Sequence, residues 1–145
     1  MKIKCISKTG QSIIQYTRKI TPIKKGEYTE FGCSLDTEYD ELFIGKEYLV
    51  MGLILRGGYL HYLIDEDGRI AFYPYPLFEI TDNRMPKNWN FNAFEIDNDI
   101  YINVEAVWGY YELCFEQDHF EKLIDMEKTA QQIYFMRKIE MEQEL

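Results

Sequence analysis

The chain has 145 residues, of which 46% are hydrophobic, and it carries a formal net charge of −9. This length suits a single domain, residues 1–145, that buries enough surface to fold without a disulfide or a metal ion. The acidic balance disfavours direct binding to nucleic acid, because contact with phosphates needs a net basic face.

The first predicted strand covers residues 2–7, where lysines alternate with isoleucine or cysteine as in a half-buried strand. Residues 8–41 contain scattered glycines and only weakly apolar stretches. We therefore expect a long excursion there, with one short strand near residues 12–16.

Residues 46–80 hold four apolar runs rich in aromatic and β-branched side chains: 46–55, 59–64, 69–73 and 77–80. Residues 56–58, 65–68 and 74–76 separate them and carry the Gly, Asp and Pro typical of turns. This pattern predicts an antiparallel meander, hence an SH3-like bent sheet or small barrel. We expect Tyr48, Leu53, Phe72 and Phe78 to close its core.

Residues 81–88 are polar and predict a connector, after which Trp89 and Phe91 are expected to fold back as a cap on the barrel. Residues 97–99 predict a turn, and the alternation over 100–108 predicts a further strand. The β-rich body should therefore extend over about residues 1–108.

Beyond Gly109 the apolar period becomes helical, and residues 110–143 are expected to form a C-terminal helical region. Its apolar stripe runs through residues 120–141, widened by Met136 and Ile139. Asp125 or Thr129 could cap a restart, so one kinked helix and two helices are both compatible with the pattern. The predicted fold class is α+β.

The negative charge is concentrated at one end of the chain. Residues 1–90 carry twelve acids and twelve bases, whereas residues 91–145 carry thirteen acids against four bases. A basic protein partner would meet either this region or the acidic run near residue 40. Within the chain, that run could instead pair with the basic residues before position 26, and the whole acidic surface could serve only solubility. The candidate partner-binding residues are Asp36, Glu38, Asp40, Glu41, Glu112, Glu116, Asp118 and Glu121.

Catalytic chemistry has little support in the sequence. His61 lies within a predicted strand and His119 beside Asp118, and neither belongs to a nucleophile–histidine arrangement. No His or Cys ligands have the spacing of a zinc site, and no phosphate-binding loop is present. We therefore expect no enzymatic activity, no cofactor and no metal.

A second hypothesis places function on the aromatic residues of the meander. Tyr59, Tyr62, Tyr75 and Trp89 could line a surface that binds a peptide or a small ligand, although filling and rimming the barrel would account for most of them. Three widely spaced cysteines and the absence of an apolar leader or membrane-length segment predict a reduced, cytoplasmic protein that spans no membrane.

Two motifs give the chain a resemblance. The run Ile44-Gly45-Lys46-Glu47-Tyr48-Leu49-Val50 precedes the aromatic hairpin, and Tyr73-Pro74-Tyr75-Pro76-Leu77-Phe78-Glu79-Ile80 follows it, before Trp89 and an acidic helix. In this order the chain resembles a family of small bacterial proteins that includes immunity proteins of contact-dependent growth inhibition and related polymorphic toxin systems. The resemblance implies a protein that neutralises a basic toxin, expected to be a nuclease, by stoichiometric binding. We expect the chain itself to be a monomer or a weak dimer.

Overall fold

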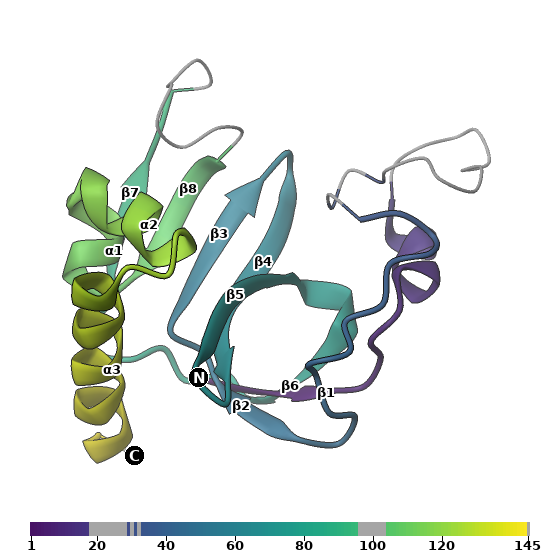
Figure 1. Ribbon diagram of the computed structural model, residues 1–145, viewed down its shortest axis with the longest axis horizontal. Coiled ribbons are helices and arrows are strands. Elements are labelled where there is room, and N and C mark those ends of the chain that lie inside the picture. The colour runs from purple at the N-terminus through teal and green to yellow at the C-terminus, as the bar shows by residue number, and fades with distance from the viewer. Residues whose placement is uncertain (18–28, 30, 32, 96–103, 145) are drawn as a thin grey trace.

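The computed structural model describes residues 1–17, 29, 31, 33–95 and 104–144 (Figure 1). Over these residues the fold is α+β, with two antiparallel sheets of three and five strands followed by C-terminal helices. The helices lie beside the five-stranded sheet, whereas residues 8–17 and 33–41 of the excursion lie at the other end of the molecule (Figure 1). The architecture is that of two sheets and not of a closed barrel.

The three-stranded sheet has the order β2-β1-β6, with β1 Lys2–Cys5, β2 Glu47–Leu49 and β6 Phe78–Asp82. The alternation predicted for the first strand is confirmed, because Ile3 and Cys5 are fully buried while the lysines point outward. On the outer face Lys4 forms an ion pair with Glu79 of β6 at 2.8 Å. The first strand of the chain is thus the centre of this sheet.

The five-stranded sheet has the order β5-β4-β3-β8-β7. Its strands are β3 Gly52–Arg56, β4 Tyr59–Glu66, β5 Arg69–Pro74, β7 Asn90–Ala93 and β8 Val104–Gly109. Its two hairpins turn at Gly57-Gly58 and Asp67-Gly68, and all four of these residues have positive φ. Two such residues in a row match the right-handed twist of the flanking strands, which explains the Gly-Gly and Asp-Gly pairs in the sequence.

The chain passes between the two sheets three times: at Val50-Met51, at the 3₁₀ turn η2, Tyr75–Leu77, and along residues 83–89. The strands on either side of the first two crossings enclose a first core that includes Tyr48, Leu53 and Phe78, as predicted. Phe72 is a correction, because it packs on the opposite face and stacks on Phe120 at 5.5 Å. Adjacent residues of a strand point to opposite faces, and Tyr73 is the one that enters the first core.

Residues predicted as a short strand near 12–16 form a 3₁₀ helix instead, η1, Gly10–Tyr16. Local hydroxyl groups favour this turn. Ser12 Oγ donates to the carbonyl of Thr9 at 2.6 Å and accepts from the Ser7 hydroxyl at 2.7 Å. Such side-chain bonds compete with strand pairing.

The C-terminal region forms three helices over the described residues: α1 Tyr111–Phe115, α2 Gln117–Ile124 and α3 Lys128–Gln143. The break before α3 contains Met126 with φ 58, and neither Asp125 nor Thr129 caps the restart, which begins after Glu127. None of the helices described here is long and apolar enough to cross a membrane.

The helices approach the five-stranded sheet closely because two glycines face each other in it. Gly52 of β3 pairs with Gly109 of β8, and a Cβ on either would lie 2.4 or 2.7 Å from Leu113 Cδ2. Leu113 of α1 is fully buried at this point in a second core, between the sheet and the helices. The glycines therefore set the distance between helix and sheet.

The region around Trp89 differs from the expected cap. Residues 90–93 pair with β8 as the edge strand β7, which the sequence did not predict, and Phe91 is 52% exposed on it. Trp89 is half-buried and packs against both cores. Part of the predicted strand is β8, whereas residues 97–103 lie outside the described residues.

Three carboxylates whose side chains are mostly withdrawn from solvent connect the layers. Asp65 accepts hydrogen bonds from Tyr134 Oη at 2.9 Å and Lys138 Nζ at 2.8 Å, both on α3. Its neighbour Glu66 points to the other face of β4. There it binds Lys46 Nζ at 2.7 Å and the Tyr48 hydroxyl at 2.6 Å. Residues 65–68 were predicted to form a turn, but β4 continues through Glu66 because these partners, distant in sequence, satisfy both acids.

The third carboxylate, Glu112 of α1, binds Arg137 of α3 through Nε at 2.9 Å and Nη2 at 2.5 Å. The Glu112 side chain is only 11% exposed, so the pair is mostly withdrawn from solvent. α3 is thus held to the sheet by Asp65 and to α1 by Glu112.

Candidate functional site

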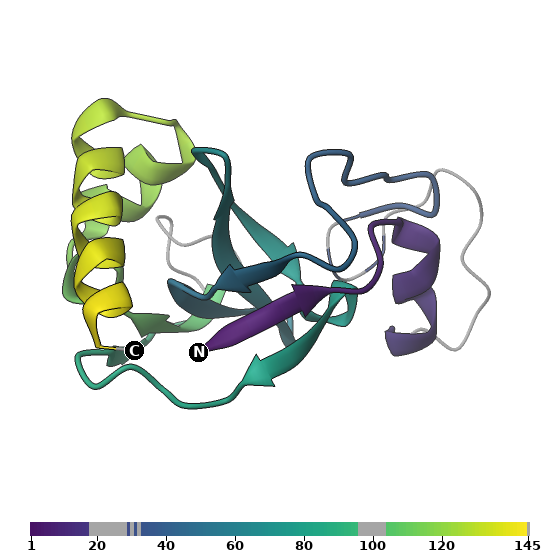
Figure 2. The same ribbon diagram turned by 90° about the horizontal axis from the view of Figure 1, so that it is seen from below.

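The predicted acidic residues fall into two groups that lie at opposite ends of the molecule. The helices carry one group, and the segment 36–41 beside η1 carries the other (Figure 2). The two groups therefore cannot form a single contact surface for a small partner.

The group on the helices forms a surface that we call the acidic helical surface, defined by Glu116, Asp118, Glu121, Asp125 and Glu127. All five side chains are exposed, and none forms an ion pair with a described residue. The single base among residues 116–127 is Lys122, which is exposed as well. Five acids against one base produce a local negative field, which none of the ion pairs between described residues neutralises.

Large apolar side chains interleave with these acids. Tyr111 is 53% exposed, Phe115 47%, Ile124 55% and Met126 57%. The rings of Tyr111 and Phe115 pack on each other with centroids 5.2 Å apart. Aromatic and methionine side chains are enriched in protein interfaces, and acids around them suit a basic partner.

A groove of about 620 Å³ runs between α2 and α3 within this surface. It is lined by Glu116, Gln117, Asp118, His119, Lys122, Thr129, Ala130 and Ile133. The two carboxylates, together with the aliphatic side chains of Ala130 and Ile133, suit a guest that has an apolar stem and a cationic head, as lysine and arginine do.

His119 lies at the base of this groove but is only 3% exposed, and its Nε2 shares a 2.6 Å hydrogen bond with the Tyr110 hydroxyl. Burial lowers the pKa of His119, while Glu112 opposes this change. Burial also raises the pKa of Tyr110. The pair is neutral near pH 7 and positions α2 on the second core.

Two of the predicted acids do not face solvent as expected. Glu112 is buried and committed to Arg137, so it is removed from the candidate contact residues. Glu41 accepts a hydrogen bond from the Tyr73 hydroxyl at 2.7 Å and is half-buried. Asp36, Glu38 and Asp40 are exposed and form no ion pair with a described residue. The basic residues at 18–25, which were considered as their internal partners, lie outside the described residues.

The aromatic hypothesis requires correction, because its residues do not form one accessible surface. Tyr59 and Tyr62 are 4% and 3% exposed and belong to the first core. Tyr75 is half-buried, with its ring 5.9 Å from Phe31 and 6.0 Å from Tyr16. Trp89 is half-buried and packs against both cores. The apolar character of the strands reflects core filling.

His61 is also part of the interior. Its ring nitrogens lie 3.2 Å from the carbonyl oxygens of Tyr59 and Phe31, and burial lowers its pKa. In the described part of the chain, no group of three or more His, Cys, Asp or Glu side chains could hold a metal ion.

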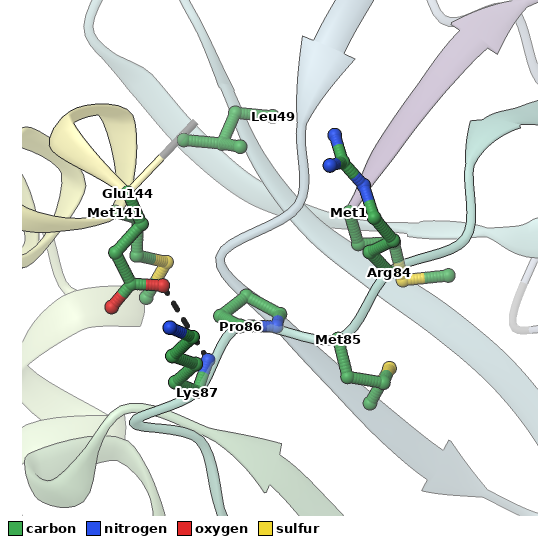
Figure 3. A pocket seen from close by; sticks show the side chains of 8 residues that line it. All are labelled: Met1, Leu49, Arg84, Met85, Pro86, Lys87, Met141 and Glu144. Carbon is green, nitrogen blue, oxygen red and sulfur yellow. Dashed lines mark hydrogen bonds between the residues drawn. The ribbon is translucent and has the colours of Figure 1, made fainter.

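A small pocket of about 190 Å³ lies where β1, the 83–89 connector and the end of α3 meet (Figure 3). Its walls are mostly apolar, and Glu144 closes one side by accepting from the Lys87 N–H at 3.4 Å. Arg84 is already bonded to Asp82. The volume is below the roughly 300 Å³ at which small-molecule sites begin, so this pocket is a seam between three segments.

Comparison of the chain with models of protein families, with curated proteins and with solved structures finds no match. The resemblance to bacterial immunity proteins therefore stays a prediction. The candidate site depends on the geometry of the acidic helical surface alone.

Proposed function

We propose that this protein is an immunity-type inhibitor that neutralises a basic toxin domain, a nuclease, by stoichiometric binding through the acidic helical surface. The observation that carries the proposal is the combination, within residues 111–127, of five exposed carboxylates that form no ion pair with a described residue and four large apolar side chains that are about half exposed. Charge would steer the encounter, and the apolar residues would hold the complex.

A nuclease must present a basic face to bind its phosphate substrate. A protein that covers this face with a matching acidic one blocks access of the nucleic acid, and no chemistry is required of the inhibitor. The groove between α2 and α3 would receive a lysine or arginine of the toxin, with its stem on Ile133 and its cationic head beside Glu116 and Asp118.

The proposed architecture is SH3-like. The connectivity that supports it is a first strand, a long excursion, two hairpins, a 3₁₀ turn and a closing strand that pairs with the first. The proposed compartment is the cytoplasm, where a nuclease meets its substrate. Three free and buried cysteines suit a reducing compartment.

The experiment measures the association rate with the toxin domain encoded beside this gene. Reversing three exposed acids of the acidic helical surface (Glu116→Lys, Asp118→Lys and Glu121→Lys) should slow association by about ten- to a hundredfold. The matched control reverses Asp36, Glu38 and Asp40 to lysine. It changes the net charge by the same amount at the opposite end of the molecule and should slow association far less.

Salt provides a second test. Raising the ionic strength from about 0.05 to 0.5 M shortens the Debye length from about 14 to 4 Å. The association rate of the wild-type protein should therefore fall more than that of the variant with Glu116, Asp118 and Glu121 reversed. Equal slowing by both triple variants would assign the effect to overall charge. Rates that respond to neither salt nor reversal would reduce the acidic surface to a solubility device and end the proposal.

A further inference from the structure

α3 has a second apolar face that points away from the protein. The side chains of Lys128, Gln132, Phe135 and Ile139 recur at three- and four-residue steps, with Met136 beside them. Phe135 is half-buried and lies at the edge of this face, where it also packs against the second core. Met136 is 47% exposed and Ile139 56% exposed, whereas Tyr134 and Met141 on the inner face are buried. The sequence predicted that Met136 and Ile139 widen the inner stripe, but they lie on the opposite side of the helix.

This outer face forms a shallow groove of about 560 Å³, lined by Lys128, Gln131, Gln132, Phe135, Met136, Ile139 and Glu140. α3 lies at the edge of the molecule in both views, with this side unpartnered by any described segment (Figures 1 and 2). An exposed apolar strip on a helix is a common feature of interaction sites.

The charge of α3 indicates which partner fits. Residues 128–144 carry three bases and three acids, although the chain as a whole carries −9. A second copy would be repelled from the acidic helical surface but not from this neutral helix. The charges are also separated along the helix. Lys128 stands at its start and Glu142 near its end, and neither forms an ion pair with a described residue.

We propose that two copies of this chain associate through the outer faces of α3, with the helices antiparallel. A two-fold axis between Phe135 and Met136 sets Phe135 against the partner's Met136 and Gln132 against the partner's Ile139. It also brings Lys128 to the end of the helix that carries the partner's Glu142. The same two contacts repeat by symmetry, as an isologous interface requires.

The size of the face sets the strength of this dimer. A helix of 16 residues is about 24 Å long and about 10 Å wide. Such a face buries less than the roughly 800 Å² per partner found in stable complexes, so the dimer is weak and concentration-dependent. The acidic helical surface of each copy stays free, and a dimer would present two of them.

The test is sedimentation equilibrium of the full chain at protein concentrations from about 10 to 500 μM. This range covers the dissociation constant expected for so small an interface. The mass should rise from the monomer's 17.4 kDa towards twice that value. Ile139→Lys should weaken the dimer by about a hundredfold, since the change occurs twice in the interface. The matched control, Ile124→Lys, alters a side chain of equal exposure on α2 and should leave the dimer intact. Far-UV circular dichroism verifies that both variants are folded.

A charge exchange distinguishes specific pairing from overall repulsion. Glu142→Lys lowers the net negative charge of each copy, so overall repulsion between two copies decreases. The dimer should nevertheless weaken by about two- to tenfold, because the new lysine would face the partner's Lys128, which has the same charge. Lys128→Glu should weaken it by a similar factor, and the double variant should restore it. A wild-type protein that stays monomeric over the whole range would overturn the proposal. So would equal effects of the two isoleucine variants, or a tighter dimer in Glu142→Lys.

Discussion

Replacing Arg137 by methionine should destabilise the protein by about 3 kcal/mol, because it leaves the Glu112 carboxylate buried without its cation. The structure supplies the estimate. Arg137 gives Glu112 two charge-assisted hydrogen bonds, each of which contributes about 1.5 to 3 kcal/mol when the group is buried. The Arg137 side chain is 28% exposed, so water recovers part of the loss, and the lower end of the range expected for a broken buried ion pair applies.

The assay is urea unfolding at pH 7, followed by tryptophan fluorescence, for four proteins: wild type, Arg137→Met, Glu112→Gln and the double variant. The double variant removes both charges and should lose less than Arg137→Met alone, which gives a coupling energy of about 2 kcal/mol. Glu112→Gln should cost less than Arg137→Met, because the remaining guanidinium keeps its bond to Glu140 and reaches solvent.

Arg84→Met is the matched control. Arg84 also binds a carboxylate through two nitrogens, that of Asp82, but it is 77% exposed. Its removal should cost no more than about 1 kcal/mol, as for other surface pairs. If Arg137→Met costs no more than Arg84→Met, the attachment of α3 through Glu112 contributes little, and the reasoning from burial is wrong.

Two further predictions concern the body of the protein. Phe78→Ala should cost about 3 to 5 kcal/mol, because this ring is 7% exposed and packs edge-on against Tyr48, Tyr62 and Tyr73; an unchanged thermal midpoint would remove β6 from the core. Burial raises the pKa of Glu66, but hydrogen bonds from Lys46 and Tyr48 outweigh it and leave the pKa below the ordinary 4.5. The corresponding stabilisation is therefore present above pH 4.5 and lost as the pH falls through the folded value. Lys46→Met should move acid unfolding, followed by circular dichroism, to higher pH, and an identical acid profile would contradict this assignment.

The local elements were predictable from the sequence because their signals are local. Glycine and aspartate pairs located both hairpins, and the change of apolar period at Gly109 located the start of the helices. The errors share a different origin. Strand β4 continues through Asp65 and Glu66 because of cations elsewhere in the chain, and β7 is a four-residue edge strand whose apolar residues, Phe91 and Ala93, face solvent.

The candidate site was predictable only in part. Charge counting identified the acidic region, and the exposed carboxylates of α2 match it. The same count could not distinguish Glu112 from Glu116. Glu112 pairs with Arg137 where α1 packs against α3, whereas Glu116 is exposed. Nor could it separate the two apolar faces of α3, since both contain large side chains at helical spacing. Which face is buried depends on where α3 packs, and that is a property of the whole fold.

The adjacent carboxylates of β4 have a consequence for how the molecule opens. Asp65 holds α3, and Glu66 on the opposite face holds the residues that begin β2. If β4 loses its extended conformation, both acids leave their partners together, so the helical layer and the three-stranded sheet should be released in one cooperative step. Amide protons of α3 and of β1 should then exchange with solvent through a common opening of the same free energy. Strand β4 alone would thus couple the unfolding of the helical layer to that of the three-stranded sheet, although these two layers make few direct contacts.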